Sequence, residues 1–384
     1  MMIEFNEEHR MVRRMVRDFA RKEMAPIAIE MDEKEQFPHE TFKKMAELNL
    51  LGLPFDEKYG GAGFDLISYT ITLEELARVC ASTALSYSAH VSLAASPIDM
   101  FGTEEQKQKY LVPLAKGEKI GSFGLSEPEA GSDAGSIQTT ARKEGDRYIL
   151  NGSKMWITNA EVADIFVVAA VTDKEKGRKG ISNFIVERGF PGFEVGKKEK
   201  KCGMRASPTN MLHFSDCEVP AENLLGQENA GYRQFLTTLD GGRVGIAAQA
   251  LGIAKEALKR SLNYAQQRVQ FGKKIGEFQA IQFKLADMAT KIHAAELMIY
   301  DAAWKKQNGQ PYIHEAGMAK LFATEMATEA ANQAIQIHGG VGYTKEYEVE
   351  RFWRDAKLLE IGEGTSEVQR IVIYRELLKQ IEKI

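Results

Sequence analysis

The sequence predicts an α+β protein in which two helical domains flank a central β domain. Both ends of the chain carry apolar residues at helical spacing, whereas short apolar runs between glycines and prolines fill the middle. The expected domains are an N-terminal α-helical domain over residues 1–119, a middle β domain over residues 120–230 and a C-terminal α-helical bundle over residues 231–384.

The N-terminal domain contains several predicted helices and one glycine-rich stretch. Residues 7–24 have amphipathic spacing, and further helices are expected over residues 40–48, 68–79 and 103–115, the last opening on a capping box. Residues 59–64 are rich in glycine but lack the strand and helix that flank a dinucleotide-binding loop, so we interpret them as a plain turn. The buried face of the first helix is expected to hold Met11, Met15, Val16, Phe19 and Ala20.

In the middle domain, strands are expected over residues 165–171, 183–186 and 211–214. Asn151 and Gly152 form the dipeptide that is typical of a hairpin turn. The lysine-rich run at residues 197–201 has two interpretations, a phosphate-attracting patch or a solvated strand edge, and the second is the simpler one.

The C-terminal domain is predicted from three long helical segments over residues 244–266, 278–307 and 314–338. Helices of this length that pack side by side are typical of a bundle. The third segment ends on Gly339 and Gly340, which suit a helix C-cap. Because these glycines follow a helix and not a strand, they do not form a Rossmann turn.

Composition excludes several classes of function. The 50 basic and 54 acidic residues are spread along the chain, so no basic stripe indicates a nucleic-acid partner. No apolar run approaches the roughly 18 to 20 residues of a membrane span. The three cysteines are far apart, which favours a reducing compartment, and the acidic first helix does not resemble a signal peptide. We therefore expect a cytoplasmic protein.

One glutamate stands out as a candidate for chemistry. Glu363 lies between Gly362 and Gly364, and Thr365 or Ser366 can cap the helix that follows. Taken alone, the stretch is better explained as a loop between two helices with a solvated glutamate. The chain shows no metal-ligating pattern such as H-E-x-x-H or C-x-x-C, and no G-x-S-x-G nucleophile. A carboxylate base without metal or nucleophile needs an electron-accepting cofactor for redox work, and composition does not name it.

Seven segments in register make the sequence resemble the acyl-CoA dehydrogenase family, and within it the short-chain (butyryl-CoA) type. Each segment is weak alone, but together they extend over most of the chain in the right order. They are residues 123–133, 154–159, 203–207, 239–243, 268–272, 336–340 and 363–367.

The resemblance implies an acyl-CoA dehydrogenase-like fold that ends in a four-helix bundle, a homotetramer, and one FAD per subunit bound without a Rossmann domain. Parts of the FAD site are expected to cross a subunit boundary. The residues implied to contact FAD are Phe123, Leu125, Ser126, Ser132, Trp156, Ile157, Thr158, Arg268, Phe271, Gln279, Gln336, Ile337, Gly339, Gly340, Thr365 and Glu367.

The implied chemistry is α,β-dehydrogenation of a short-chain acyl-CoA to a trans-2-enoyl-CoA. Glu363 is the implied base for the α-proton, and exclusion of water is expected to raise its pKa. Electrons are expected to pass to an electron-transferring flavoprotein. The residues implied to contact acyl-CoA are Ser132, Asp240, Arg243 and Gly364. For Arg243 a salt bridge to Asp240 within one helix is an equally good interpretation.

Several alternatives remain open at this stage. Some relatives place the base at the position that matches Gly242, but here that position has no side chain, so Glu363 is the only candidate for the base. Acyl-CoA oxidases share the chemistry but discharge electrons to oxygen, and an inactive helical scaffold is a further alternative. Gly362 stands where short- and medium-chain members often have an aromatic residue, so branched substrates such as isobutyryl-CoA or 2-methylbutyryl-CoA are also candidates.

Overall fold

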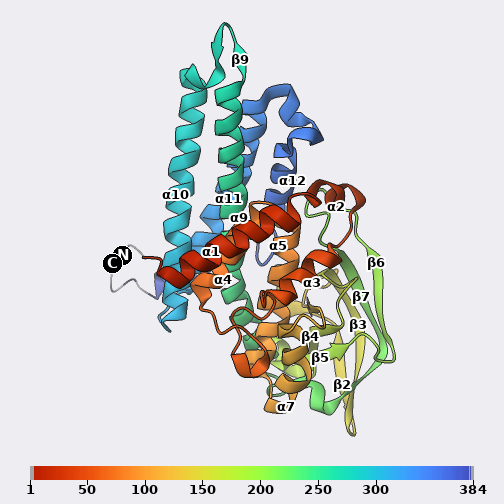
Figure 1. The fold of residues 1–384 in the computed structure, drawn as a ribbon. Helices are drawn as coiled ribbons and strands as arrows, with labels where there is room; N and C mark the ends of the chain where they lie inside the picture. The colour runs from red at the N-terminus through yellow and green to blue at the C-terminus, as the bar shows by residue number, and fades with distance from the viewer. Residues whose placement is uncertain (1–3, 380, 382–384) are drawn as a thin grey trace.

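The computed structural model describes residues 4–379 and 381. A tall bundle of helices stands beside a twisted β-sheet, and the N-terminal helices pack across both (Figure 1). The three-part α/β/α order predicted from the sequence is confirmed. Among the described residues no helix is long and apolar enough to cross a membrane, and no group of three or more metal-ligating side chains occurs.

The N-terminal helices form where caps and apolar spacing agree. Helix α1 starts at Asn6, whose side chain accepts a hydrogen bond from the His9 backbone, and it buries Val12, Val16 and Phe19. Met11 was predicted on this face but is 47% exposed, because the buried stripe lies one residue further along. The helices are α1 (Glu7–Phe19), α2 (Ala28–Lys34), α3 (His39–Glu47), α4 (Leu66–Ala77), α5 (Ala81–Ser88), α6 (Ser96–Phe101), α7 (Glu104–Gln106) and α8 (Val112–Ala115).

The middle domain is one sheet in the order β6-β7-β3-β2-β4-β5-β8, with β1 paired to β4. The predicted hairpin at Asn151 is wrong, because the chain turns between Glu144 and Arg147 and β3 continues through Asn151. The Asn151 amide donates to Asp216 on β7, beside a bulge. The strands are β1 (Gly121–Gly124), β2 (Thr140–Glu144), β3 (Arg147–Thr158), β4 (Ile165–Val171), β5 (Ile181–Glu187), β6 (Phe193–Lys198), β7 (Thr209–Pro220) and β8 (Leu224–Leu225).

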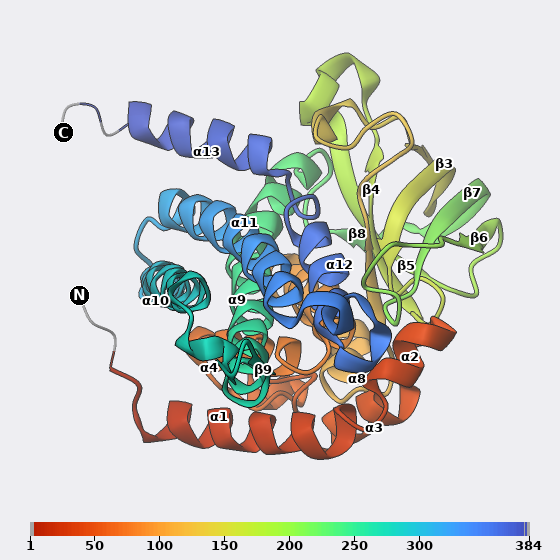
Figure 2. The same ribbon diagram turned by 90° about the horizontal axis from the view of Figure 1, so that it is seen from above.

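The C-terminal bundle is built on α9, which starts 13 residues before the predicted position 244, at Gly231. Tertiary packing of its glycine-containing first turns overrides their low helix propensity. Helix α13 runs beside α11 and projects from the molecule (Figure 2). The elements are α9 (Gly231–Gln267), β9 (Val269–Gln270), β10 (Lys273–Lys274), α10 (Gln279–Gln307), α11 (Ile313–His338), α12 (Val349–Leu359) and α13 (Ser366–Leu378). The domain boundaries stay a prediction.

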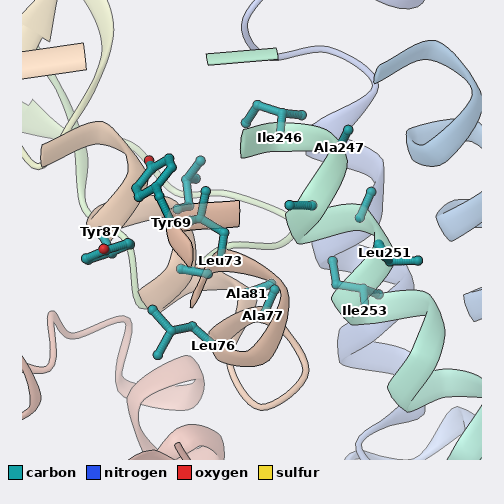
Figure 3. Packing of buried hydrophobic residues seen from close by; sticks show 14 of the residues in the cluster. Tyr69, Leu73, Leu76, Ala77, Ala81, Tyr87, Ile246, Ala247, Leu251 and Ile253 are labelled. Atoms are coloured by element: carbon teal, nitrogen blue, oxygen red, sulfur yellow. The ribbon is translucent and has the colours of Figure 1, made fainter. Parts of the chain in front are cut away.

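Helices α4 and α9 pack closely and fix the floor of the candidate site. Leu73 and Ala77 on α4 face α9, where a Cβ on Gly245 would lie 3.0 Å from Leu73 and one on Gly252 would lie 3.0 Å from Ala77 (Figure 3). A Cβ at Gly252 would lie 2.3 Å from the Glu74 carbonyl oxygen, so this glycine is needed for the close approach. The N-terminal half of α9 is thereby held against α4 and α5.

Candidate active site

A strained turn between α12 and α13 carries Glu363. The backbone of Glu363 has φ 53° and that of Gly364 has φ 93°, both in the left-handed region. For a non-glycine residue this conformation is uncommon, and such strain gathers at functional sites. The Thr365 hydroxyl caps α13 by accepting a hydrogen bond from the Val368 backbone at 3.3 Å, as predicted. From this turn the glutamate side chain reaches Gly242 on α9.

The carboxylate of Glu363 is buried and unpaired. Its Oε2 atom is inaccessible and has no hydrogen-bond partner among the described residues, although the residue as a whole is half-buried. Burial raises its pKa to about 7, and the positive charges of Lys320 and Arg243 oppose that rise. A carboxyl group with a pKa near neutrality is well suited to take a proton.

Gly242 on helix α9 lies opposite the Glu363 carboxylate. A Cβ on Gly242 would lie 1.9 Å from Glu363 Oε2, so only glycine leaves room for the glutamate. The next residue, Arg243, forms a salt bridge of 2.6 Å with Asp240 one turn earlier. The helix-internal ion pair that the sequence allowed is therefore present, and a role for either residue in binding substrate stays a prediction.

Lys320 on α11 is a site residue that the sequence analysis missed. Its side chain is fully buried, and Nζ donates a hydrogen bond of 2.7 Å to the carbonyl oxygen of Gly364. Burial lowers the pKa of Lys320 to about 8, while the Glu363 carboxylate opposes that change. The only signal in the sequence is a lysine inside an apolar helical run. Lys320 both anchors the turn and supplies a positive charge beside Glu363.

In the β domain, a buried ion pair holds the loop after β1. Lys154 Nζ contacts Glu127 at 2.7 Å and donates to the Leu125 carbonyl oxygen at 3.1 Å. The Glu127 carboxylate also accepts hydrogen bonds from the backbones of Gln138 and Thr139. These contacts fix the backbone of the predicted flavin loop against β3.

Strand β3 carries predicted flavin-contacting residues where its pairing with β7 is irregular. Its register with β7 is broken between Lys154 and Ile157, and Trp156 in the gap has φ 63° and is 57% exposed. The Met155 backbone donates to Ser126, which brings Ser126 beside Trp156. An exposed indole beside fixed backbone groups fits a flat, polar-edged ring such as a flavin.

A second group of predicted FAD contacts lies at the far end of the bundle, whereas Thr365 and Glu367 lie at the start of α13, next to Glu363. Arg268 and Phe271 belong to the β9–β10 hairpin, where Phe271 is 94% exposed. The end of α11 joins them, because Tyr264 on α9 and His338 on α11 stack at 4.4 Å. A Cβ on Gly339 or Gly340 would meet nothing within 4 Å, so this surface is open. One chain does not bring this group together with the flavin loop (Figure 1).

Three family models match the chain in succession. They are the acyl-CoA dehydrogenase N-terminal domain over residues 6–118, the middle domain over residues 122–217 and the C-terminal domain over residues 229–378. The chain therefore belongs to the acyl-CoA dehydrogenase family, whose members are flavoproteins. It is an oxidoreductase that acts on CH–CH bonds.

Individual relatives are similar over their full length. A probable acyl-CoA dehydrogenase of Bacillus subtilis is 58% identical over 99% of this chain and 100% of its own. A short-chain specific acyl-CoA dehydrogenase of Clostridium acetobutylicum is 53% identical over 98% and 100%. The structure of butyryl-CoA dehydrogenase from Megasphaera elsdenii is 49% identical, with a TM-score of 0.97 over 98% of this chain and 100% of that one. A chain from a structural study of the electron transferring flavoprotein of Acidaminococcus fermentans is 52% identical, also with a TM-score of 0.97 over 98% and 100%.

Proposed function

We propose that this protein is an FAD-dependent dehydrogenase of short-chain acyl-CoA, with Glu363 as the catalytic base. The observation that carries the proposal is the buried, unpaired carboxylate on a strained turn, opposite Gly242. Its pKa of about 7 suits removal of a proton near neutral pH. The names of the Clostridium and Megasphaera relatives support the short-chain assignment.

The roles of the chain's own groups follow from this geometry. Glu363 takes the α-proton of the thioester, and Gly242 leaves space for the carboxylate to approach. The Glu363 backbone N–H donates to the thioester carbonyl oxygen, which stabilises the negative charge that develops as the proton leaves. Lys320 holds the turn through the Gly364 carbonyl oxygen. When bound, FAD supplies the acceptor for the hydride that leaves the β-carbon.

FAD is proposed to lie between two subunits of a homotetramer. Glu363 meets α9 at Gly242, and Arg268 follows the end of the same helix at Gln267. At 1.5 Å per residue these points are about 37 Å apart, which is too far for one cofactor to reach from a flavin beside Glu363. A second subunit must therefore supply the Arg268 end. The 94% exposed Phe271 supports this, because a bare aromatic ring favours burial against a partner.

The proposed electron acceptor is an electron-transferring flavoprotein. The similarity to a chain from the Acidaminococcus study supports this choice. The alternative is an oxidase that discharges to oxygen. Stoichiometric peroxide released at the rate of turnover in air would identify the oxidase, whereas we expect slow oxygen uptake and fast reduction of the flavoprotein. A cytoplasmic location is part of the proposal, because the chain has only scattered cysteines.

Branched short acyl groups are a second candidate class. A Cβ on Gly362 would meet only the Leu358 carbonyl oxygen, at 3.6 Å, so open space lies where many relatives have an aromatic ring. The test is a rate profile of the purified yellow enzyme over straight and branched acyl-CoAs with an artificial electron acceptor. We expect a maximum at butyryl-CoA. A maximum at isobutyryl-CoA or 2-methylbutyryl-CoA would assign the branched class, and no turnover with any of them would contradict the proposed function.

A further inference from the structure

A cavity lies where the N-terminal helices meet the C-terminal bundle. Its lining comes from α1 and the π-helical segment Ala20–Met24 that follows it, from α4, and from α9 and α12. The volume is about 140 Å³, several times the roughly 30 Å³ that one water molecule occupies in the liquid. Glu256 on the cavity wall lies about 21 Å further along α9 than Gly242, at 1.5 Å per residue. The cavity is therefore separate from the candidate active site.

Cationic side chains outnumber carboxylates in this cavity. Five cations and three carboxylates line it, so the lining carries a positive charge. The Glu256 carboxylate is shared by three of the cations, whose nitrogens lie 3.0 to 3.4 Å from its oxygens. A concave surface with an excess of one charge attracts counter-ions of the opposite charge. The cations are Arg17, Arg21, Arg78, Lys259 and Arg260, and the carboxylates are those of Glu75, Glu256 and Glu348.

Arg21 is the cation of this group that has no partner in the protein. Within the described part of the chain, its guanidinium group forms neither an ion pair nor a hydrogen bond. Arg17 binds Glu75 through Nε and Nη2, at 3.0 and 2.7 Å, and Arg260 likewise uses Nε and Nη2. The Nη1 groups of these two arginines therefore stay available to a ligand. Guanidinium N–H groups match the oxygens of a phosphate in geometry and in charge.

The carboxylates of the cavity are buried, and the cations at its rim reach solvent. Glu75 and Glu256 are both buried. In contrast, 46% of the Lys259 side chain and 41% of the Arg260 side chain are exposed. The buried carboxylates orient the cations from the protein side, and an anion can enter from the solvent side. An anion at the rim keeps its distance from the carboxylates and stays partly hydrated, which limits the cost of desolvation.

We propose that this cavity binds a phosphate dianion, either free phosphate or the terminal group of a phosphate monoester. A tetrahedral dianion fits the volume and offsets the excess of positive charge. Among the described lining residues the one aromatic side chain, Phe352, is buried, so no ring is open to stack on a base. The bound anion links α1 to α9 and stabilises the enzyme without taking part in the chemistry at Glu363. Helix α1 and helix α13 lie on opposite sides of the bundle, so the cavity is remote from the exposed face of α13 (Figure 2).

The test measures the binding of inorganic phosphate to the FAD-loaded enzyme by isothermal titration calorimetry. Sodium chloride keeps the ionic strength constant, because screening would otherwise change together with the ligand. We expect saturable binding of one phosphate per chain. Arg21→Gln removes a cation without a protein partner, so this variant should fold normally and bind phosphate at least about tenfold more weakly. Phosphate should also raise the unfolding temperature of the wild type more than that of Arg21→Gln.

Arg14→Gln is the matched control. Arg14 is an exposed arginine of α1 that also has no ion pair among the described residues, but it does not line the cavity. Its loss should leave the affinity for phosphate unchanged, and butyryl-CoA should bleach the flavin equally well in both variants. In a second arm AMP replaces phosphate: tighter binding of AMP assigns a monoester as the ligand, and binding that is no tighter assigns free phosphate. No saturable binding of phosphate by the wild type, or equal affinities in Arg21→Gln and Arg14→Gln, overturns the inference and leaves the proposed function untouched.

Discussion

At the scale of the residue, two opposing effects set the pKa of Glu363. Burial disfavours its charged form, whereas Lys320 and Arg243 favour it, and the balance is a pKa of about 7. The charge of Arg243 is paired with Asp240, so the Lys320 ammonium group has the larger effect on the pKa of Glu363. The left-handed backbone at Glu363 also restricts the direction in which its side chain can point.

The pH profile of flavin reduction should follow this balance. Glu363 must be ionised to take a proton, so kcat/KM for butyryl-CoA should rise with pH through about 7 and fall off below it. Lys320→Met removes a charge that lowers the pKa of Glu363, so the profile should move to higher pH. Lys320→Arg should restore much of the original position.

The matched control for Lys320 is Lys291→Met. Lys291 pairs with Glu329 on the bundle surface, so its loss should leave the profile in place. Stopped-flow bleaching across pH 5 to 9 under anaerobic conditions gives all the profiles. A Lys320→Met profile that coincides with the wild type would show that this lysine only supports the fold.

At the scale of the element, the loop after β1 depends on β3. Lys154 is fully buried and Glu127 nearly so, and together they pin the loop that carries Leu125 and Ser126. Loops usually lie on the surface and move, but this one is held by a buried ion pair and two backbone hydrogen bonds. The predicted flavin contacts therefore rest on a rigid support.

Breaking this pair should destabilise the protein and release FAD. Lys154→Met leaves the Glu127 carboxylate buried without its cation, which should lower the free energy of unfolding by about 3–5 kcal/mol. The double variant Lys154→Met with Glu127→Gln should recover most of the loss. Arg147→Met is the control, because the exposed Arg147–Glu218 pair is worth at most about 1 kcal/mol. Denaturation midpoints and FAD absorbance measure both effects, and equal losses in the single and double variants would contradict the account.

Gly242 on α9 lies opposite the Glu363 turn, so we expect that the catalytic base can be moved from residue 363 to residue 242. Gly242 lies against the carboxylate, so a glutamate there reaches the same space from the opposite element. The variant Glu363→Gly with Gly242→Glu should regain part of the bleaching activity that Glu363→Gly loses, with an altered acyl preference. Gly241→Glu with Glu363→Gly is the control, because Gly241 faces Lys306 instead. Equal activity of the two double variants would argue against the proposed approach.

Element by element, the sequence was informative where contacts are local. Strand β4 was predicted at its observed bounds because Ile165–Val171 is a short, wholly apolar run. The Asn151 hairpin failed because pairing with β7 continued the strand past a local turn signal. Lys320 could not be found, since its partner Gly364 lies 44 residues away and only the tertiary fold joins them.

At the scale of the whole molecule, the candidate FAD site is divided. The flavin loop and Glu363 lie toward one end of α9, and the hairpin with Phe271 lies at the other (Figure 1). Helix α13 also leaves Ile371 and Tyr374 at least half exposed beside α11. These surfaces, together with the division of the site, favour an assembly in which each cofactor is held by two chains.

Complementation between two damaged variants tests this arrangement. Arg268→Ala with Phe271→Ala removes the hairpin half of the site, and Trp156→Glu removes the flavin half. Each variant alone should purify without FAD. When the two variants are coexpressed, a hybrid assembly contains one site that combines the intact hairpin half of one chain with the intact flavin half of the other. Such sites should bind FAD, so part of the FAD absorbance should return. Hybrids that stay colourless, although they contain both chains, would mean that each FAD is held within one chain.

The most direct test of the central claim is anaerobic flavin bleaching by butyryl-CoA in Glu363→Gln. Glutamine keeps the size of the side chain but cannot accept the α-proton, so FAD and acyl-CoA should still bind. The rate of bleaching should fall by about 100- to 10,000-fold. Glu360→Gln, which alters a carboxylate paired with Lys357 on the same turn, should bleach at the wild-type rate. If Glu363→Gln bleaches near the wild-type rate while it binds both ligands, Glu363 is not the base.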